Sequence, residues 1–230
     1  MLQKIIVSNC ASENFFELLD KNSICYIKSL NNEKFNNNYN DHIDLSILKI
    51  DNDIYIENSV FAYYKDFLKD YNLIKVDVSD FKNGETVLNV AKNDKYFFHN
   101  EKFTTKEIFE SLNLKRKYIK INQGYSNCSM ICFKNHIITS DEGVFKSLKS
   151  KNINVELVTT TGIILNGYKN GFIGGTCGFV SDNTLLFYGD VTKYQDYDII
   201  KRVADEENVK ILFPKGEDFV DLGGIVSLWR

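Results

Sequence analysis

Short apolar segments alternate with polar turns along the chain, and the same pattern occurs five times. Each occurrence has an apolar segment, a polar turn such as Asp51-Asn52-Asp53, and a second segment rich in β-branched or aromatic residues. Two such segments around a short polar turn predict a β-hairpin. The hairpins fall in windows of 17 residues that align without a gap, at 42–58, 84–100, 125–141, 174–190 and, split between the chain ends, 223–230 continued by 1–9.

A helical segment and a third apolar strand follow each predicted hairpin. The windows close on Asn or Asp, which accept hydrogen bonds from the free amides of a first helical turn, so this position predicts helix N-caps. These closing residues are Asn9, Asn58, Asn100, Asp141 and Asp190. The third strands are expected at 25–30, 73–78, 118–121, 155–158 and 209–213. Each repeat is therefore predicted to be a ββαβ unit.

Units of this kind favour a ring, because one ββαβ unit cannot bury both its sheet face and its helix alone. We expect residues 1–230 to form one domain: an α/β, five-bladed ββαβ propeller with pseudo-five-fold symmetry. In this interpretation Met1 and Arg230 share the fifth hairpin, and Trp229 lies in the core. Residues 31–40 form a polar linker. The alternative is an α+β protein in which five hairpins arise by chance.

Composition limits the classes of partner. The chain is 43% apolar and 26% charged, with a net charge of -3, so it has no basic footprint for nucleic acid. No apolar run is long enough to span a bilayer, and the first residues lack the apolar stretch of a signal peptide. Five cysteines, an odd number, favour reduced thiols in a cytoplasm. We expect a cytoplasmic protein that acts on a small molecule, with no nucleic-acid or membrane partner and an unknown oligomeric state.

Neither a metal site nor a cofactor site is indicated. Cys128 and Cys132 are four residues apart, there is no Cys-x-x-Cys, and the three histidines are scattered. The glycine pairs at 174–175 and 223–224 match neither a dinucleotide-binding nor a P-loop pattern, and close backbone packing explains them better. We therefore expect no metal and no cofactor.

Three motifs bring candidate chemistry to the starts of the windows. His42-Ile43-Asp44 opens the first window, and Cys128 lies in Gly124–Ser129 at the start of the third. Asp221 stands before the glycine pair that opens the fifth, with one extra residue, Leu222, between them. The histidine precedes the cysteine by two repeats, and Asp221 precedes the histidine by one repeat if the count runs through the chain ends.

These motifs and their cyclic order resemble the guanidino-group-modifying enzymes, the pentein superfamily, in circularly permuted form. That superfamily has five ββαβ repeats around a pore, a carboxylate before two glycines, an H-x-D motif and a glycine-led strand with the nucleophilic cysteine. The chain also looks like an uncharacterised family of Clostridium-type bacteria assigned to this fold, through the patterns QGYxxCS and GFIGG. The superfamily usually has an acid that holds the guanidinium, whereas the corresponding segment 174–179 of this chain is uncharged.

The resemblance implies roles for particular side chains in the pore. The predicted catalytic residues are Cys128, His42 and Asp221, and the predicted substrate-binding residues are Asp44, Asn127, Asn89 and Thr176. Each has a structural alternative. Cys128 shares its window position with apolar residues and fits a small core residue. His42 fits a surface cap, and Asp221 fits a turn with the glycines.

The predicted function is a cysteine-dependent hydrolase or transferase that acts on a guanidine, amidine or amide C–N bond, with an unknown substrate. A thiolate is a strong nucleophile for an electron-poor planar carbon, and a nearby imidazole can carry the proton to the leaving amine. The alternative is a binding or scaffold protein without catalysis, since the superfamily includes a ribosome anti-association factor with the same shape.

Overall fold

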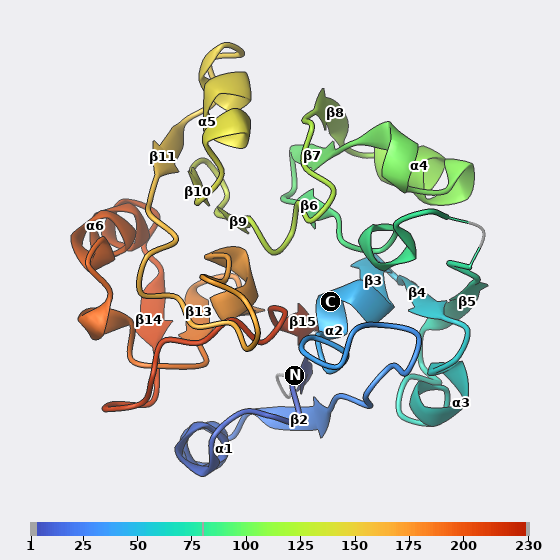
Figure 1. Ribbon diagram of the computed structural model, residues 1–230, viewed down its shortest axis with the longest axis horizontal. Helices are drawn as coiled ribbons and strands as arrows, with labels where there is room; N and C mark the ends of the chain where they lie inside the picture. Colours follow the sequence, from blue (N-terminus) through green and yellow to red (C-terminus); the bar gives the residue numbers. More distant parts are fainter. Residues whose placement is uncertain (1–3, 80, 229–230) are drawn as a thin grey trace.

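The computed structural model describes residues 4–79 and 81–228, and its strands and helices are arranged around a common centre (Figure 1). The strands are β1 (Lys4–Val7), β2 (Cys25–Lys28), β3 (Ile47–Ile50), β4 (Asp53–Glu57), β5 (Asn72–Val76), β6 (Ala91–Lys92), β7 (Tyr96–His99), β8 (Lys117–Lys120), β9 (Met130–Cys132), β10 (Ile137–Thr139), β11 (Val155–Leu157), β12 (Cys177–Ser181), β13 (Thr184–Phe187), β14 (Lys210–Leu212) and β15 (Val226–Ser227). The helices are α1 (Glu13–Lys21), α2 (Ile43–Ser46), α3 (Phe61–Tyr64), α4 (Lys106–Asn113), α5 (Glu142–Lys149) and α6 (Tyr197–Glu206).

These strands form five three-stranded sheets in the described part of the chain. In every sheet the middle strand pairs antiparallel with one neighbour, across the hairpin, and parallel with the other. This arrangement confirms the predicted order of two hairpin strands followed by a third strand, and it shows that the third strand is parallel to the second. Helices connect the second and third strands, as a parallel pairing requires.

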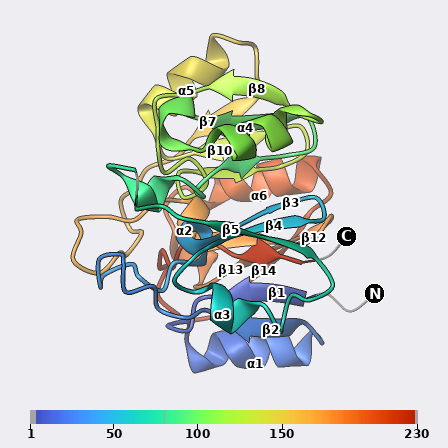
Figure 2. The same cartoon turned by 90° about the vertical axis from the view of Figure 1, so that its right-hand side faces the viewer.

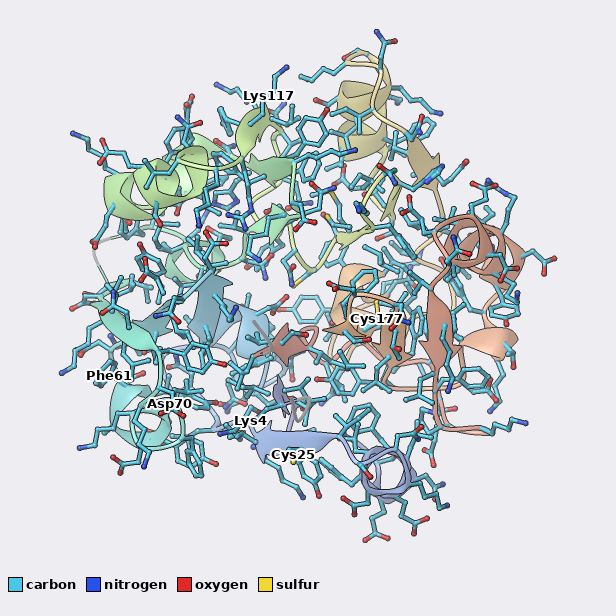
Figure 3. The ribbon with its side chains drawn as sticks, turned by 180° about the vertical axis from the view of Figure 1, so that it is seen from behind. Lys4, Cys25, Phe61, Asp70, Lys117 and Cys177 are labelled. Carbon is cyan, nitrogen blue, oxygen red and sulfur yellow. The ribbon has the colours of Figure 1, made fainter. Side chains whose placement is uncertain are left out.

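The first strand of each hairpin lies on the inside. In Figure 1, β3, β6, β9 and β15 lie near the centre, as does the helical turn α2, whereas the third strands and the other helices lie outside them. Figure 3 shows the same layering in side chains: Cys177, at the start of β12, is close to the middle, and Cys25, at the start of β2, is at the edge. Residues at the starts of the first strands are therefore brought towards one another.

The fifth sheet joins the two ends of the chain. β15 pairs antiparallel with β1 through Ile5↔Ser227 and Ile6↔Val226, and β1 pairs parallel with β2. Strands at opposite ends of the sequence therefore form one hairpin-like pair, as predicted. The further expectations for Met1, Trp229 and Arg230 lie outside the described residues.

The beginnings of the windows differ from the prediction. We expected a strand there, but His42 precedes the helical turn α2, and short 3-10 turns occupy Gly84–Thr86 and Gly174–Thr176. The first strands begin only after these turns. A turn of helix projects polar side chains in several directions rather than on alternate faces, so His42 and Asp44 are not displayed as on a strand.

The predicted N-caps are confirmed only in part. Asp141 caps α5 by accepting a hydrogen bond from Val144 N, and Asn100 and Asp190 cap 3-10 turns in the same way. Asn9 and Asn58 are not caps, because α1 is capped by Ser12 and α3 begins after Val60. The prediction failed there because several residues separate the strand from the helix, so the cap belongs to the residue at the helix start.

The helices pack through apolar residues four positions apart, which lie on one helix face. These fully buried pairs are Phe15 with Leu19, Ile108 with Leu112, and Val144 with Leu148. They join clusters that also contain strand residues, such as Ile5 and Val7 with α1. Of the described helices, none combines the length and apolar character needed to cross a bilayer.

Tyr188, which follows β13, ties this core to the closed fifth hairpin. Its hydroxyl accepts a hydrogen bond from Ser8 N at 2.9 Å and donates one to Gly224 O at 2.7 Å. The side chain is 1% exposed, so water cannot replace either bond. One hydroxyl therefore connects the end of β1 with the segment that leads into β15.

Tyr188→Phe is expected to lower the free energy of unfolding by about 1–2 kcal/mol, because a buried amide and a buried carbonyl lose their partner. Urea unfolding followed by fluorescence measures the change. Tyr26→Phe is the matched control, since that tyrosine is only partly buried. Equal stability of the two variants would contradict a structural role for the Tyr188 hydroxyl.

Candidate active site

The candidate site lies where the first strands begin, at the end of the molecule opposite to the hairpin turns. Backbone hydrogen bonds join its segments: Asp44 N donates to Gly223 O at 3.2 Å, and Gly175 N donates to Cys128 O at 3.0 Å. Gly224 N donates to Gly175 O at 2.9 Å. These bonds hold segments from four repeats together, although they are far apart in the sequence. In Figure 2, the turn α2, which carries Asp44, lies to the left of β3 and β4.

Cys128 and Asp44 are in direct contact. The Cys128 thiol donates to Asp44 Oδ2 at 3.0 Å, and Asn89 Nδ2 donates to Cys128 Sγ at 3.1 Å. Burial raises the pKa of the Cys128 thiol well above its usual range, and the Asp44 and Asp221 carboxylates raise it further. The resting sulfur is therefore a neutral thiol that points at a carboxylate.

Asp44 is a buried acid with one occupied and one free oxygen. Asn127 Nδ2 donates to Oδ2 at 3.0 Å, whereas Oδ1 is buried and has no hydrogen-bond partner among the described residues. Burial raises the pKa of Asp44 to about 6, although His42, Asn127 and Cys128 lower it. Its free oxygen and its partly suppressed charge leave Asp44 able to receive a proton or a cation.

Asp221 is held by the backbone. Its Oδ2 accepts from Phe172 N at 2.8 Å and its Oδ1 accepts from Gly223 N at 3.1 Å. Burial raises its pKa, and His42 is the largest influence in the opposite direction. The turn with the glycines exists, as the structural alternative predicts, but Asp221 is also buried, with 2% of its surface exposed, and lies near the His42 imidazole.

His42 interacts electrostatically with both carboxylates. It lowers the pKa of both Asp44 and Asp221, and it is 4% exposed, so it is not a surface cap. Gly223 allows this position, because a Cβ there would overlap the His42 side chain and the backbone has φ of 77°, which favours glycine. Gly223, two residues after Asp221, is therefore needed for the close approach of His42.

The remaining predicted residues behave differently from one another. Asn89 Oδ1 accepts from the backbone N–H groups of Asn127 (2.8 Å) and Cys128 (3.2 Å), so this side chain holds the cysteine segment in place. Asn127 contacts Asp44, as described above. Thr176 is fully buried, and its hydroxyl donates to Ile173 O at 2.7 Å within its own turn. It makes no hydrogen bond to the other site residues among those described.

An aromatic group beside the site was not predicted. The Tyr39 ring lies 6.0 Å from the His42 ring and 6.1 Å from the Tyr168 ring, and Tyr125 donates its hydroxyl to Glu85 Oε1 at 2.9 Å. Tyr39 lies in the segment that we interpreted as a polar linker. Its aromatic character within an Asn-rich loop, and the closeness of Tyr125 to Cys128, were the available signals.

The four central side chains are enclosed in this state. Cys128, His42, Asp44 and Asp221 are each at most 4% exposed. The described residues contain no group of three or more His, Cys, Asp or Glu side chains arranged to hold a metal ion. The two carboxylates and the imidazole fit proton transfer and the binding of a small organic cation, and the Cys128 sulfur beside them fits a nucleophile.

Solved structures with the same fold are guanidino-group hydrolases and transferases. A cysteine-to-serine variant of DDAH from Pseudomonas aeruginosa, in complex with citrulline, has 8% identity and a TM-score of 0.57, and the match covers 93% of each chain. An amidinotransferase from Microseira wollei of the saxitoxin pathway has 11% identity and a TM-score of 0.57, with 94% of this chain and 78% of that chain covered. The inosamine-phosphate amidinotransferase of Streptomyces griseus has 11% identity and a TM-score of 0.54, with 92% and 77% covered.

Sequence identities this low do not establish an activity, but the structural matches establish the fold. The chain has the pentein fold of the guanidino-group-modifying enzymes, which confirms the resemblance seen in the motifs. No curated protein has a significant sequence match to it. The model of the family described as a family of unknown function (DUF6873) matches residues 6–226, and the chain therefore belongs to that family.

Proposed function

We propose that this protein is a cysteine-dependent hydrolase or transferase that breaks a C–N bond of a cationic guanidine or amidine. The proposal takes residues 1–230 as one domain in which five units are related by pseudo-five-fold symmetry and face one pore. The observation that carries it is the contact between the Cys128 thiol and Asp44, with His42 close to both Asp44 and Asp221. Structural neighbours that bind citrulline or transfer amidino groups support the same reaction class.

The electrostatics favour a cationic substrate over a neutral amide. Two buried carboxylates raise the pKa of the Cys128 thiol, and both also have raised pKa values because burial disfavours their charge. A guanidinium or amidinium between them would supply the missing positive charge. It would stabilise both carboxylates and weaken their effect on the thiol, so that binding of the substrate promotes the thiolate.

The proposed reaction has two steps. The Cys128 sulfur attacks the central carbon, its proton passes to His42, and the C–N bond breaks as His42 protonates the leaving amine. A covalent thiouronium or thioimidate intermediate remains on the sulfur. Water then attacks that carbon and releases the thiol in a hydrolase, whereas an acceptor amine does so in a transferase. Asn89 and Asn127 position the cysteine and Asp44 rather than react.

A pair of isosteric electrophiles tests the proposal. Chloroacetamidine is cationic and chloroacetamide is neutral, and each alkylates a thiol with loss of chloride. We expect Cys128 to react at least about tenfold faster with the amidine than with the amide at pH 7.5, relative to the exposed thiols Cys10 and Cys25 in the same molecule. Peptide mass mapping over time measures the three rates.

Asp221→Asn and His42→Ala are the informative variants. The first should remove most of the preference for the amidine, and the second should slow the reaction at Cys128 with both reagents. Cys128→Ser should leave only the two exposed thiols labelled. Equal ratios of amidine to amide labelling at Cys128, Cys10 and Cys25 in the wild-type protein would contradict the proposal.

A binding protein without catalysis remains the second candidate, because one observation favours it. The Cys128 side chain is 3% exposed and its thiol pKa is raised, which is the environment of an inert core cysteine. The same experiment separates the two functions, since an inert Cys128 would be labelled more slowly than Cys10 and Cys25 by both reagents.

A further inference from the structure

A group of basic side chains lies at the other end of the inner strands, near the hairpin turns. Lys49 is on β3, one residue from its end, and Lys92 is the last residue of β6. Arg116 precedes β8 and reaches back to the turn after β6, where its Nε donates to Asn93 O at 3.0 Å. This group, Lys49, Lys92 and Arg116, is separate from the candidate active site, which precedes the same strands.

Arg116 has an unused donor inside the protein. Its Nη2 donates to Asp51 Oδ1 at 2.8 Å, and its side chain is only 10% exposed. Its Nη1 is buried and has no hydrogen-bond partner among residues 4–79 and 81–228. A buried guanidinium nitrogen without an acceptor is costly, and native structures usually supply an acceptor.

Lys92 faces the same excess of positive charge. Its amine makes no hydrogen bond or ion pair within the described chain. Burial, together with the nearby charges of Arg116 and Lys49, lowers the pKa of this amine to about 8. Asp51 acts against them, as Cys132 does more weakly, but Asp51 is already shared between Arg116 and Lys115, whose Nζ lies 3.0 Å from Asp51 Oδ2.

We infer that the basic group formed by Lys92 and Arg116, with Lys49 beside them, is a binding site for a small doubly charged oxyanion such as phosphate or sulfate. Such an anion would accept a hydrogen bond from the free Arg116 Nη1 and would balance the positive charge of the protonated Lys92 amine. The planar guanidinium offers directed donors that suit tetrahedral oxyanions, and the ammonium adds a point charge. The inference does not depend on the chemistry proposed for Cys128.

Thermal unfolding in sodium phosphate or sodium sulfate, compared with sodium chloride at the same ionic strength, tests the site. These anions also stabilise proteins by exclusion from their surface, so the matched comparison is between variants. Lys92→Met removes the charge and keeps the volume. Lys95→Met makes the same change three residues away, where the lysine is exposed and bonded to Asn135.

We expect the wild-type protein and Lys95→Met to gain several degrees in Tm over the chloride reference, with saturation at millimolar anion, and Lys92→Met to lose that gain. Binding of phosphate followed by calorimetry should show one site in the wild-type protein and none in Lys92→Met. Equal gains in all three proteins would overturn the inference. So would a loss of the gain in both lysine variants, because that would be a general effect of surface charge.

Discussion

Asp44→Asn is expected to raise the free energy of unfolding by about 2 kcal/mol at pH 8 and to change it very little at pH 4. Burial holds the pKa of Asp44 at about 6 in the folded protein, against roughly 4 in an unfolded chain. Between these two values the folded state binds the proton more tightly than the unfolded state. The wild-type protein therefore loses stability as the pH rises from about 4 to about 6, and it does not recover this loss at higher pH.

Asparagine avoids that loss because it is neutral at every pH. A difference of about two pKa units corresponds to about 3 kcal/mol. The gain is smaller in practice, because the free Oδ1 position would then carry an amide that lacks a partner. Urea unfolding of both proteins at pH 4, 6 and 8 measures the change. The same variant should lower the pKa of the Cys128 thiol, since Asp44 raises it.

Asp51→Asn is the matched control, with the opposite sign. Hydrogen bonds from Arg116, opposed by partial burial and helped by Lys115, hold the pKa of Asp51 at about 2. Its contribution to stability is present above about pH 4 and is lost as the pH falls towards 2, so Asp51→Asn should destabilise the protein at pH 8. If Asp44→Asn also destabilised it at pH 8, attraction between Asp44 and His42 would have to outweigh the effect of burial.

Gly175→Ala is expected to lower the free energy of unfolding by about 3 kcal/mol and to abolish the preference of Cys128 for chloroacetamidine. A methyl group on Gly175 would overlap the Asp221 carboxylate. The carboxylate would have to move and would lose its hydrogen bonds from Phe172 N and Gly223 N. Gly175 also bonds through its backbone to Cys128, Leu222 and Gly224, so a shift of Gly175 itself would disturb the junction of three repeats.

Denaturant unfolding and the labelling ratio measure the two effects of Gly175→Ala. Gly143→Ala is the control, because Gly143 is in α5 and its nearest neighbour to an added methyl group is Asp141 Oδ1 at 3.1 Å. Its stability should change by less than about 1 kcal/mol. Truncation of the acid in the double variant Gly175→Ala, Asp221→Ala should recover part of the lost stability. No recovery would locate the strain in the backbone and not at the carboxylate.

The repeats show which structural features can be predicted from the local pattern of residues. Alternation of apolar and polar positions, with a polar turn, correctly predicted the hairpins and the existence of the third strands, because these depend on short-range geometry. The pairing register was less regular than the gap-free windows suggested. β12 and β13 pair with an irregularity between Phe179 and Ser181, so equal window positions do not always face one another. Register depends on turns and bulges that the apolar pattern does not encode.

The candidate site was predictable as a set of residues and not as an arrangement. Cys128, His42, Asp44 and Asp221 were named from motifs and their cyclic order, and the structure places them close together. Asn89 was predicted to bind substrate; three of its four side-chain hydrogen bonds are with the cysteine segment, and the fourth runs from Nδ2 to Asp44 O at 3.5 Å. Nothing in the window pattern distinguishes it from Thr176, which bonds within its own turn.

The sequence by itself determined the number and order of the repeats, the order of hairpin, helix and third strand within each of them, and the pairing of the two chain ends. These follow from the periodicity of neighbouring residues, which is a local property. Only the tertiary structure decided which oxygens and nitrogens meet, which acids have raised pKa values, and that Lys92 and Arg116 share one buried region. Those properties depend on desolvation by segments from different repeats, and the distances between such segments are set by the packing of the whole ring of sheets.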